Sequence, residues 1–543
     1  MTPRIPPPPR RVGCRAPVAA VLSLFLASVT ARAQVFSPTG ADAAAFDFFV
    51  AAPAEAPSEQ AATASPPSPG SSAPDALPSP GLFPVDGVLA ATPLSGEGDG
   101  AEGAPAQYVE EAIRDPAVAG TARARAQRAA DARLGGIPRP RYIPATDFAP
   151  PKGLILHQSD AAAGEFPFAL SMSGFLQLRW LEFARGATEW TNAAGRPNDI
   201  YNINAISLNR YLIMFKGYAV DERLIYAFAL FGTSNSGINT GVAPIGMAGW
   251  KFSEAATVGA GVTIVPGSRE FVDPSPWTIG VDRSMANTFF RPGFSPGVAS
   301  LGSLADGTLH YQAGVWNSID AGGANVLLRR GTSMAWAGNT WWEPLAPFGM
   351  GFSDMEIHDR AAVRVGTSGV FAPSTRALPV PGFNPENTIV RLSDGTPLAT
   401  QGALGGSSVV DQFNFRLATI DAGWKWRGFS ANAEYYVRFL DHFVGTGPFD
   451  RPSILDQGAA GYLGWCFLPR TWEVYARSSA VTGPFGSGTE YGGGFNRYIN
   501  DSRQGRLTLE ALYLLHNPAQ NILYPYRAGY TGTAIQTQYV VAF

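Results

Sequence analysis

The chain has almost no cysteine and no long apolar run, and these absences limit how it can be held together. Its 543 residues contain two cysteines, Cys14 and Cys466. Cys14 precedes the first apolar run and is expected to leave with it, so Cys466 has no partner within the mature chain. No stretch reaches the roughly 18 continuous apolar residues that a membrane-spanning helix needs. The fold must therefore depend on backbone pairing and packing, without disulfides or transmembrane helices.

Patterns that would indicate chemistry are also missing. The five histidines show no His-Glu-x-x-His spacing and the cysteines no Cys-x-x-Cys spacing; they are His157, His310, His358, His442 and His516. Such spacings are typical of zinc enzymes and of structural metal sites. We expect no enzymatic activity, no metal, no cofactor and no nucleic-acid partner.

The first 33 residues have the pattern of a secretory signal peptide. Four arginines precede an apolar run from Val18 to Val29, and the run ends in Ala31-Arg32-Ala33. This order of basic, apolar and small residues predicts export, with cleavage before Gln34.

Residues 34–151 are rich in Ala, Pro, Ser and Gly and poor in large apolar residues. Such a segment cannot bury enough surface to offset the entropy of ordering it. We predict a disordered linker, with short frayed helices at Tyr108 to Arg114 and Ala122 to Leu134.

From Phe166 to Phe543 the chain consists of short alternating runs separated by Gly, Pro, Asn and Asp. Alternation with a period of two predicts strands with one polar and one apolar face. A soluble β-sandwich would show the same period, so alternation alone does not decide between a sandwich and a barrel. In a barrel the polar face would line the lumen, and the candidates for lumen-facing side chains are Arg179, Arg416, Glu434, Arg438, Glu473 and Arg477.

The last strand favours the barrel. In Thr533 to Phe543 the apolar residues Ile535, Tyr539, Val541 and Phe543 share one face, and Gln536 and Gln538 lie on the other. An alternating strand that ends in Phe resembles the signal read by the barrel-assembly machinery of the bacterial outer membrane, and Tyr539, Val541 and Phe543 would carry it. Aromatic residues also recur near strand ends, as in Trp341-Trp342, Trp424-Lys425-Trp426 and Tyr524-Pro525-Tyr526. Interfacial girdles of this kind are typical of transmembrane barrels.

Three short runs resemble the phosphate-selective porins of the O and P type. They are Val262 to Glu270, Val281 to Asn287 with the core Val-Asp-Arg-Ser, and Phe289 to Gly293; Glu473 to Arg477, Glu490, Gly494, Asn496 and Tyr498 add a second match. The resemblance covers residues 166–543. It implies an outer-membrane porin with a closed antiparallel β-barrel of sixteen strands, usually trimeric, with a long loop folded into the channel. Dividing 378 residues among sixteen strands leaves about 24 for each strand and its loop, which agrees with spans of about ten residues.

By this resemblance Asp282 to Ser300 forms the constriction, and Arg269, Arg283 and Arg291 project toward the solute. A guanidinium fork would suit phosphate or carboxylate. The alternative for Asp282 and Arg283 is an internal brace that pins the loop to the wall, and we favour the brace for these two residues.

The charge balance departs from the family. Residues 166–543 contain 27 Lys and Arg and 27 Asp and Glu, and the only lysines are Lys216, Lys251 and Lys425. Phosphate capture in this family relies on lysine-rich mouths and an arginine ladder, so phosphate selectivity is not carried over. We expect a general diffusion channel for small hydrophilic solutes or ions with at most a weak anion preference. A barrel anchor that displays or translocates the N-terminal segment, and an exported soluble β-rich binding protein, remain alternatives.

Overall fold

A computed structural model describes residues 142–143, 153–159, 164–234, 241–319, 334–377, 389–521 and 525–543. All of them belong to the unit Pro138–Phe543. The signal peptide, its cleavage site, the linker and the two short helices expected within it lie outside the described residues.

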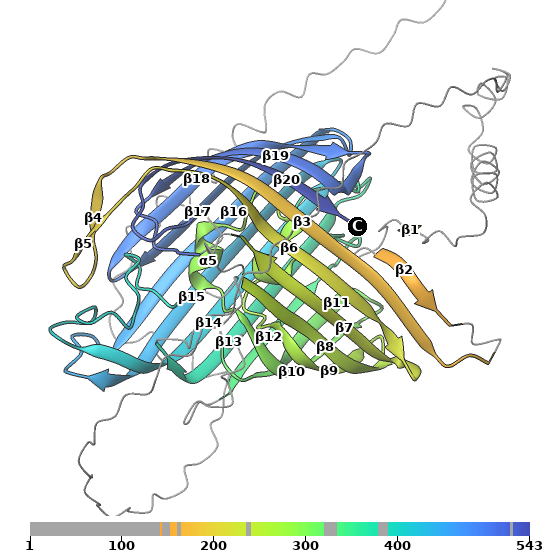
Figure 1. The fold of residues 1–543 in the computed structure, drawn as a ribbon, viewed down its shortest axis with the longest axis horizontal. Coiled ribbons are helices and arrows are strands. Elements are labelled where there is room, and N and C mark those ends of the chain that lie inside the picture. The colour runs from red at the N-terminus through yellow and green to blue at the C-terminus, as the bar shows by residue number, and fades with distance from the viewer. Residues whose placement is uncertain are drawn as a thin grey trace, which may run out of the picture. The chain divides into compact units, whose positions relative to one another are not determined.

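Sixteen antiparallel strands, β3 and β6 to β20, form a closed barrel (Figure 1). This confirms the fold class and the strand number expected from the sequence. The barrel strands are β3 (Phe168–Arg185), β6 (Ile203–Ala219), β7 (Asp221–Thr233), β8 (Gly241–Ser253), β9 (Ala256–Ile264), β10 (Phe294–Leu304), β11 (Leu309–Trp316), β12 (Ala335–Trp342), β13 (Ala362–Arg376), β14 (Val409–Trp426), β15 (Phe429–Thr446), β16 (Ser453–Leu468), β17 (Trp472–Gly483), β18 (Gly486–Ile499), β19 (Ser502–Leu515) and β20 (Gly532–Ala542). Four short strands lie outside this ring: β1 (Tyr142–Ile143), β2 (Gly153–Gln158), and the hairpin of β4 (Glu189–Thr191) and β5 (Pro197–Asp199).

The barrel closes where its last strand meets its first. β20 pairs with β3 in antiparallel register from Gly532 opposite Arg185 to Ala542 opposite Phe175. Phe543 continues this pairing, because its amide and carbonyl each form a 3.0 Å hydrogen bond with Gly174. The expectation that the terminal strand closes the barrel near Phe175 is therefore confirmed.

A strand that the sequence did not indicate covers the rest of the β3 edge. β20 ends opposite Phe175, and β2 pairs with residues 169–172 of β3 beyond that point. An uncovered edge would expose unpaired backbone donors and acceptors that attract other chains. β2 therefore extends backbone pairing along β3 past the end of the closing strand.

Period-two alternation places apolar side chains outside. On β19, Leu507, Leu509 and Leu515 are 37–44% exposed, whereas Arg506 and Glu510, at alternate positions of the same strand, are 1–2% exposed. The outward face is thus apolar and the inward face polar along this strand. A closed sheet with an apolar exterior satisfies its backbone without water, which is the condition for strands in lipid.

The two ends of the barrel differ in the length of their connections. At one end β14 and β15, and β18 and β19, are joined through Arg427-Gly428 and Asn500-Asp501, where both residues of each pair have positive φ. Such turns match the twist of the flanking strands. The opposite end carries longer connections, including residues 377–408 and 516–531. Outward aromatic residues gather near the short-turn end; they include Trp424, Trp426, Phe429, Trp465 and Phe467.

Two of the aromatic residues expected at strand ends do not lie on the exterior. Trp341 faces inward and stacks on His310 with ring centroids 4.8 Å apart. Tyr526 is 1% exposed, and its hydroxyl donates to the carbonyl of Arg283 at 2.9 Å. Tyr524 lies outside the described residues. Aromatic composition alone could not separate girdle residues from interior ones, because tyrosine and tryptophan also serve as buried hydrogen-bond donors.

Arg416 was expected in the lumen, and the structure places it on the outside. Its neighbours Phe415 and Leu417 are 1–2% exposed and face inward. Arg416 pairs with Asp441 at 2.7 Å and lies over the rings of Phe371 and Phe439. On this part of β14 the apolar side chains point inward, so the rule that polar side chains face the lumen fails for Arg416.

No helix in the described residues is long and apolar enough to cross a membrane. The short helices α4 (Arg269–Val272), η3 (Ser275–Trp277) and α5 (Met285–Phe290) all lie in one connection, between β9 and β10.

Deleting Phe543 should lower the fraction of chains that assemble. The deletion removes two backbone hydrogen bonds to Gly174 at the seam and the aromatic end of β20. The measurement is the fraction of folded barrel in outer membranes, seen as heat-modifiable migration on gels. Phe543→Trp keeps the backbone bonds and an aromatic ring, and should assemble as wild type does; equal assembly of the deletion variant would contradict this role.

Candidate functional site

The connection between β9 and β10, residues 265–293, folds into the barrel and fills part of its interior. We call it the inward segment. Its residues are buried except Val272, Asp273 and Pro274, and Figure 1 shows α5 within the ring of strands. The resemblance placed the constricting segment at Asp282 to Ser300; the structure moves it toward the N-terminus, because β10 already begins at Phe294.

Local interactions give the inward segment its shape. Ser268 and Ser284 cap α4 and α5, each hydroxyl accepting the amide of the residue three positions on. Arg283 Nε donates to the carbonyl of Glu270 at 2.9 Å, and its guanidinium lies 5.2 Å from the Phe271 ring centroid. Arg283 therefore ties the end of the segment back to its beginning.

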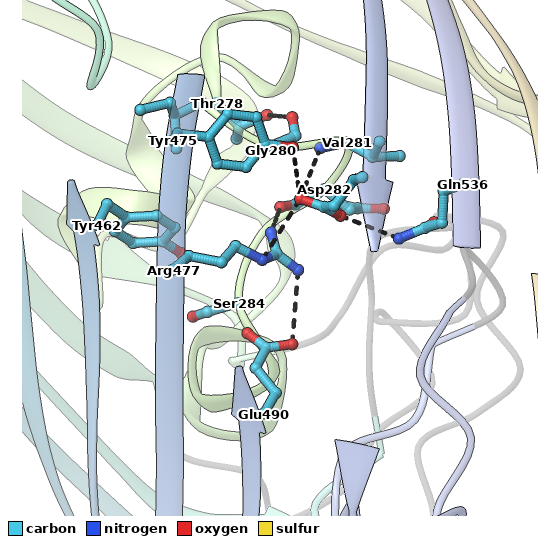
Figure 2. A network of polar contacts seen from close by, with 12 residues as sticks. Thr278, Gly280, Val281, Asp282, Ser284, Tyr462, Tyr475, Arg477, Glu490 and Gln536 are labelled. Carbon is cyan, nitrogen blue, oxygen red and sulfur yellow. Dashed lines mark hydrogen bonds and ion pairs between the residues drawn. The ribbon is translucent and has the colours of Figure 1, made fainter. Parts of the chain in front are cut away.

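Arg477 is the centre of the network that fixes the segment to the wall (Figure 2). Its Nη1 donates to the carbonyl of Asp282 at 2.5 Å, and its Nη2 donates to the Tyr526 hydroxyl at 2.8 Å. Glu490 and Glu510 each bring a carboxylate oxygen within 3.5 Å of this guanidinium. All three charged side chains are fully buried, so the pairing offsets much of the cost of taking them out of water.

The same carboxylates accept backbone amides of the inward segment. Glu490 accepts the amide of Met285 at 3.1 Å, and Glu510 accepts that of Val281 at 3.4 Å. Glu510 is held in turn by the Tyr475 hydroxyl at 2.9 Å and by the Gln536 amide at 3.0 Å. The wall thus supplies acceptors for donors that have no partner in a regular ladder.

Other wall side chains donate to the carbonyls of the segment. Arg506 donates to Thr278 at 2.5 Å, Asn496 to Ile279 at 2.8 Å and Gln538 to Val281 at 3.0 Å. These carbonyls are close in sequence, but their donors come from β18, β19 and β20. One irregular stretch is therefore held by three strands.

Two glutamates hold the start of the segment. Glu434 on β15 accepts the amides of Arg269 and Glu270, at 2.8 and 3.2 Å. Glu270 accepts the amide and hydroxyl of Ser284 at 2.6 and 2.7 Å, and also the Tyr462 hydroxyl. Burial raises the pKa of Glu270, and the hydrogen bonds from Tyr462 and Ser284 oppose that rise.

Asp282 joins the segment to the first strands of the barrel. Its carboxylate receives a bidentate pair of hydrogen bonds from Arg210, at 2.8 and 3.1 Å, and lies 3.6 Å from Arg179. All three side chains are buried. These contacts suit the brace interpretation of Asp282 and Arg283.

The arginines expected to face the solute are buried instead. Arg269 is 1% exposed, lies over the rings of Phe348 and Phe352, and is 3.7 Å from Asp421. Arg291 is 4% exposed, with its guanidinium 4.3 Å from the Phe271 ring centroid. Arg269 and Arg291 therefore do not project into water as the resemblance implied, because aromatic rings cover both guanidinium groups.

The remaining lumen candidates also lie inside the barrel and are buried. Arg438 donates to Asp456 at 2.7 Å and to the carbonyl of Phe289 at 3.3 Å. Glu473 accepts Asn496 and Tyr498, at 2.8 and 2.7 Å. Sequence analysis did not single out Arg210, Glu510 or Arg506 as lumen-facing, although the last two follow the same alternation.

A second segment, residues 343–361, enters from the short-turn end between β12 and β13. Glu356 pairs with Arg503 at 2.5 Å and with Lys425 at 3.8 Å. Burial alone would raise the pKa of Glu356, but Lys425 and Arg503 lower it to about 2. Asp354, Glu356 and His358 bring ligand-type atoms within 4.8 Å of one another. His358 is hydrogen-bonded to Asp354, and Glu356 is paired with Arg503 and Lys425. These contacts fix the second segment to the barrel wall.

One sequence pattern of the catalytic kind occurs where the inward segment ends. Gly293-Phe294-Ser295-Pro296-Gly297 has the Gly-x-Ser-x-Gly spacing of a hydrolase nucleophile. Ser295 is 0% exposed and its hydroxyl accepts the amide of Ser318 at 3.3 Å. A nucleophile must be reachable by substrate, so this serine is structural.

The opposite wall is less completely covered. We call the inward face of β6 from Leu212 onward, together with that of β7 to β11, the open wall. Strand register shows that the side chains of the open wall point into the barrel. Several of these side chains are nevertheless partly exposed, namely Met214, Lys216, Ile225, Ala227, Ile245, Met247, Leu301 and Gln312. The inward segment makes its wall contacts chiefly with β3, β6 and β13 to β20. The interior is therefore divided into a filled side and a partly exposed side.

Replacing Asp282 by Asn should loosen the inward segment. The change removes the carboxylate that pairs with buried Arg210 and Arg179, and breaking a buried ion pair costs about 3–5 kcal/mol. Hydrogen–deuterium exchange of residues 265–293 should speed up relative to wild type. Asp221→Asn, which removes an ion pair at an exposed turn, is the matched control; unchanged exchange in the Asp282 variant would show that the brace is unimportant.

Comparison with known proteins gives distant likenesses. No family model matches the chain, and no curated protein matches it. Among solved structures, the anion-selective porin from Comamonas acidovorans is 10% identical, with a TM-score of 0.43 over 69% of this chain and 100% of that one. The outer membrane channel DcaP of Acinetobacter baumannii is 9% identical, with a TM-score of 0.41 over 71% of this chain and 99% of that one. The outer-membrane expressed OmpT of Vibrio cholerae is 12% identical, with a TM-score of 0.41 and the same coverage. Similarity at this level assigns the chain to no family.

Proposed function

We propose that this protein is an outer-membrane porin, a passive channel for small hydrophilic solutes. The observation that carries the proposal is the open wall, whose side chains point into a closed barrel and are nevertheless partly exposed. Backbone that is irregular at membrane depth, such as the inward segment, is tolerated only where protein buries it or where it lines a water-filled cavity. On the filled side, protein buries the irregular backbone of the inward segment. The open wall provides the surface that would line a water-filled cavity.

The apolar exterior supports a membrane location over an exported soluble binding protein. Large apolar residues on β14 to β20 are exposed on the outward face, including Trp424, Trp426, Tyr491 and Tyr539. A soluble binding protein would place such residues in its core. For a barrel that only anchors or translocates the N-terminal segment, we find no favouring contact among the described residues.

Selectivity should be weak. The charged side chains of the filled side are engaged with one another or with the inward segment, so they contribute little net field to a permeating ion. The open wall carries Lys216 and Lys251, and Lys251 pairs with Glu254 at 2.5 Å. Lys216 lies at an inward position and would give a slight anion preference without a phosphate site.

Localisation and assembly follow from the same features. We infer export by the signal peptide, recognition of the terminal strand by the barrel-assembly machinery, and residence among outer-membrane lipids. A homotrimer is also proposed, because the outward face of β8 to β12 is lined by small residues that would let barrels approach closely: Pro244, Gly246, Ala248, Ala260, Pro296, Ser300, Gly302, Ala313 and Gly338. The mass of the purified particle in detergent measures the number of chains directly.

A bulky side chain on the open wall should reduce conductance. Ala227 faces inward and pairs with Lys216 and Met247, so Ala227→Trp would fill space beside both. Single-channel current in potassium chloride should fall at least twofold. Leu230→Trp places the same ring on the outward face of the same strand, where Leu230 is 39% exposed, and should leave the current unchanged. Absence of any channels in wild type would refute the function, and equal currents in the two variants would refute the path.

Removing the charge of Lys216 should shift ion selectivity. Lys216→Gln deletes a cation from the open wall, so the reversal potential in a salt gradient should move toward cations. Arg416→Gln removes an equal charge from the outward face, where it pairs with Asp441, and should cause no shift. Because an exposed charge is screened over about 8 Å at physiological salt, the shift should grow at low ionic strength. A shift of the same size in both variants would contradict this assignment.

A further inference from the structure

The open wall differs in chemistry from the rest of the interior. Among its described residues, the inward positions that pair across the strands from Leu212 on β6 to Gln312 on β11 include no Asp or Glu. The filled side carries Glu434, Glu473, Glu490 and Glu510 at inward positions. The passage of inorganic ions does not require one side of the interior to carry carboxylates and the other to lack them.

The exposed part of the open wall is largely apolar. Leu301 is 37% exposed at an inward position opposite Thr257, and Met214, Ile225, Ile245 and Met247 are partly exposed on the same face. Apolar surface presented to an enclosed space gives permeating ions nothing to bind, but it lowers the free energy of an apolar solute group by about 25 cal/mol per Å² removed from water.

One row of the open wall combines this apolar surface with a cation. Lys216, Ala227, Met247 and Gly261 pair in sequence across β6, β7, β8 and β9. Lys216 and Met247 are thus two strands apart, about 10 Å at the usual strand spacing. The absence of a side chain at Gly259 accommodates Met247, since the Met247 methyl group lies 2.2 Å from where a Cβ on Gly259 would stand.

We infer that the open wall favours organic monoanions with an apolar body, of the class of aromatic monocarboxylates, over inorganic phosphate. The ammonium of Lys216 would attract the carboxylate, and methionine sulfur makes favourable contacts with aromatic rings. A doubly charged phosphate would lose hydration beside Met214, Ile245 and Leu301 with nothing to replace it. This inference rests on the proposed channel function and names its solute class.

The test compares the permeability of benzoate, acetate and phosphate. Purified full-length protein in planar bilayers is placed between chloride and each sodium salt, and reversal potentials give the relative permeabilities. Benzoate diffuses more slowly than acetate in water, so a benzoate-to-acetate ratio above one requires attraction by the wall. We expect a ratio above one, and a phosphate permeability below that of both carboxylates.

Variants then assign the attraction. Met214→Ser combined with Met247→Ser should lower the benzoate-to-acetate ratio at least threefold, whereas Lys216→Gln should lower the permeability of both carboxylates relative to sodium. Met172→Ser changes a methionine on the outward face of β3 and should leave the ratio at its wild-type value. Heat-modifiable migration verifies that each variant is folded.

The outcomes separate the two proposals. If chloride is conducted but the benzoate-to-acetate ratio stays below one, or does not respond to the paired methionine change, the solute class is wrong and the channel function stands. If folded protein conducts none of the salts, the channel function fails and the inference fails with it.

Discussion

The structure depends on one constraint, which is that an irregular backbone inside a closed barrel needs hydrogen-bond partners that a regular ladder does not supply. The inward segment has few backbone pairs of its own, and it is buried almost throughout. Its amides and carbonyls are met by carboxylates, guanidinium groups and amides that project from the wall, as with Glu490 and Met285 or Arg506 and Thr278. Because an unpaired buried polar group costs about 1–3 kcal/mol, each of these side chains is needed where it stands.

This constraint also accounts for the neutral charge balance of the barrel region. The wall needs acceptors for amides and donors for carbonyls, so acidic and basic residues accumulate together, as Arg477 does with Glu490 and Glu510. Charges used in this way are tied to the backbone and to one another. The side of the barrel that the segment does not cover has no such requirement, and most of its inward side chains are small or apolar, with Lys216, Lys251 and Gln312 among them. Two different interiors therefore coexist in one ring of strands.

Sequence analysis predicted the ring itself, because period-two alternation and the terminal Phe543 report directly on strand faces and on closure. It failed where a polar side chain points outward and its apolar neighbours point inward. Arg416 is the example, because Phe415 and Leu417 on either side of it pack inside the barrel. It also placed Arg269 and Arg291 in water, because a sequence does not show which aromatic rings will enclose a guanidinium group. The division of the interior depends on which wall the inward segment contacts, and that follows from the register of strands more than 200 residues away.

These separations have a consequence for the order of events during folding. Residues 278–281 take partners on β18, β19 and β20 that lie 217 to 257 residues further along the chain. The inward segment therefore has no place to dock until the last strands are present, and its polar groups stay hydrated until then. Contacts of such long range form late because their loop-closure entropy must be met first. The pairing of β20 with β3 at Phe543 and the exclusion of water from the filled side should accordingly occur together, as the last step of folding.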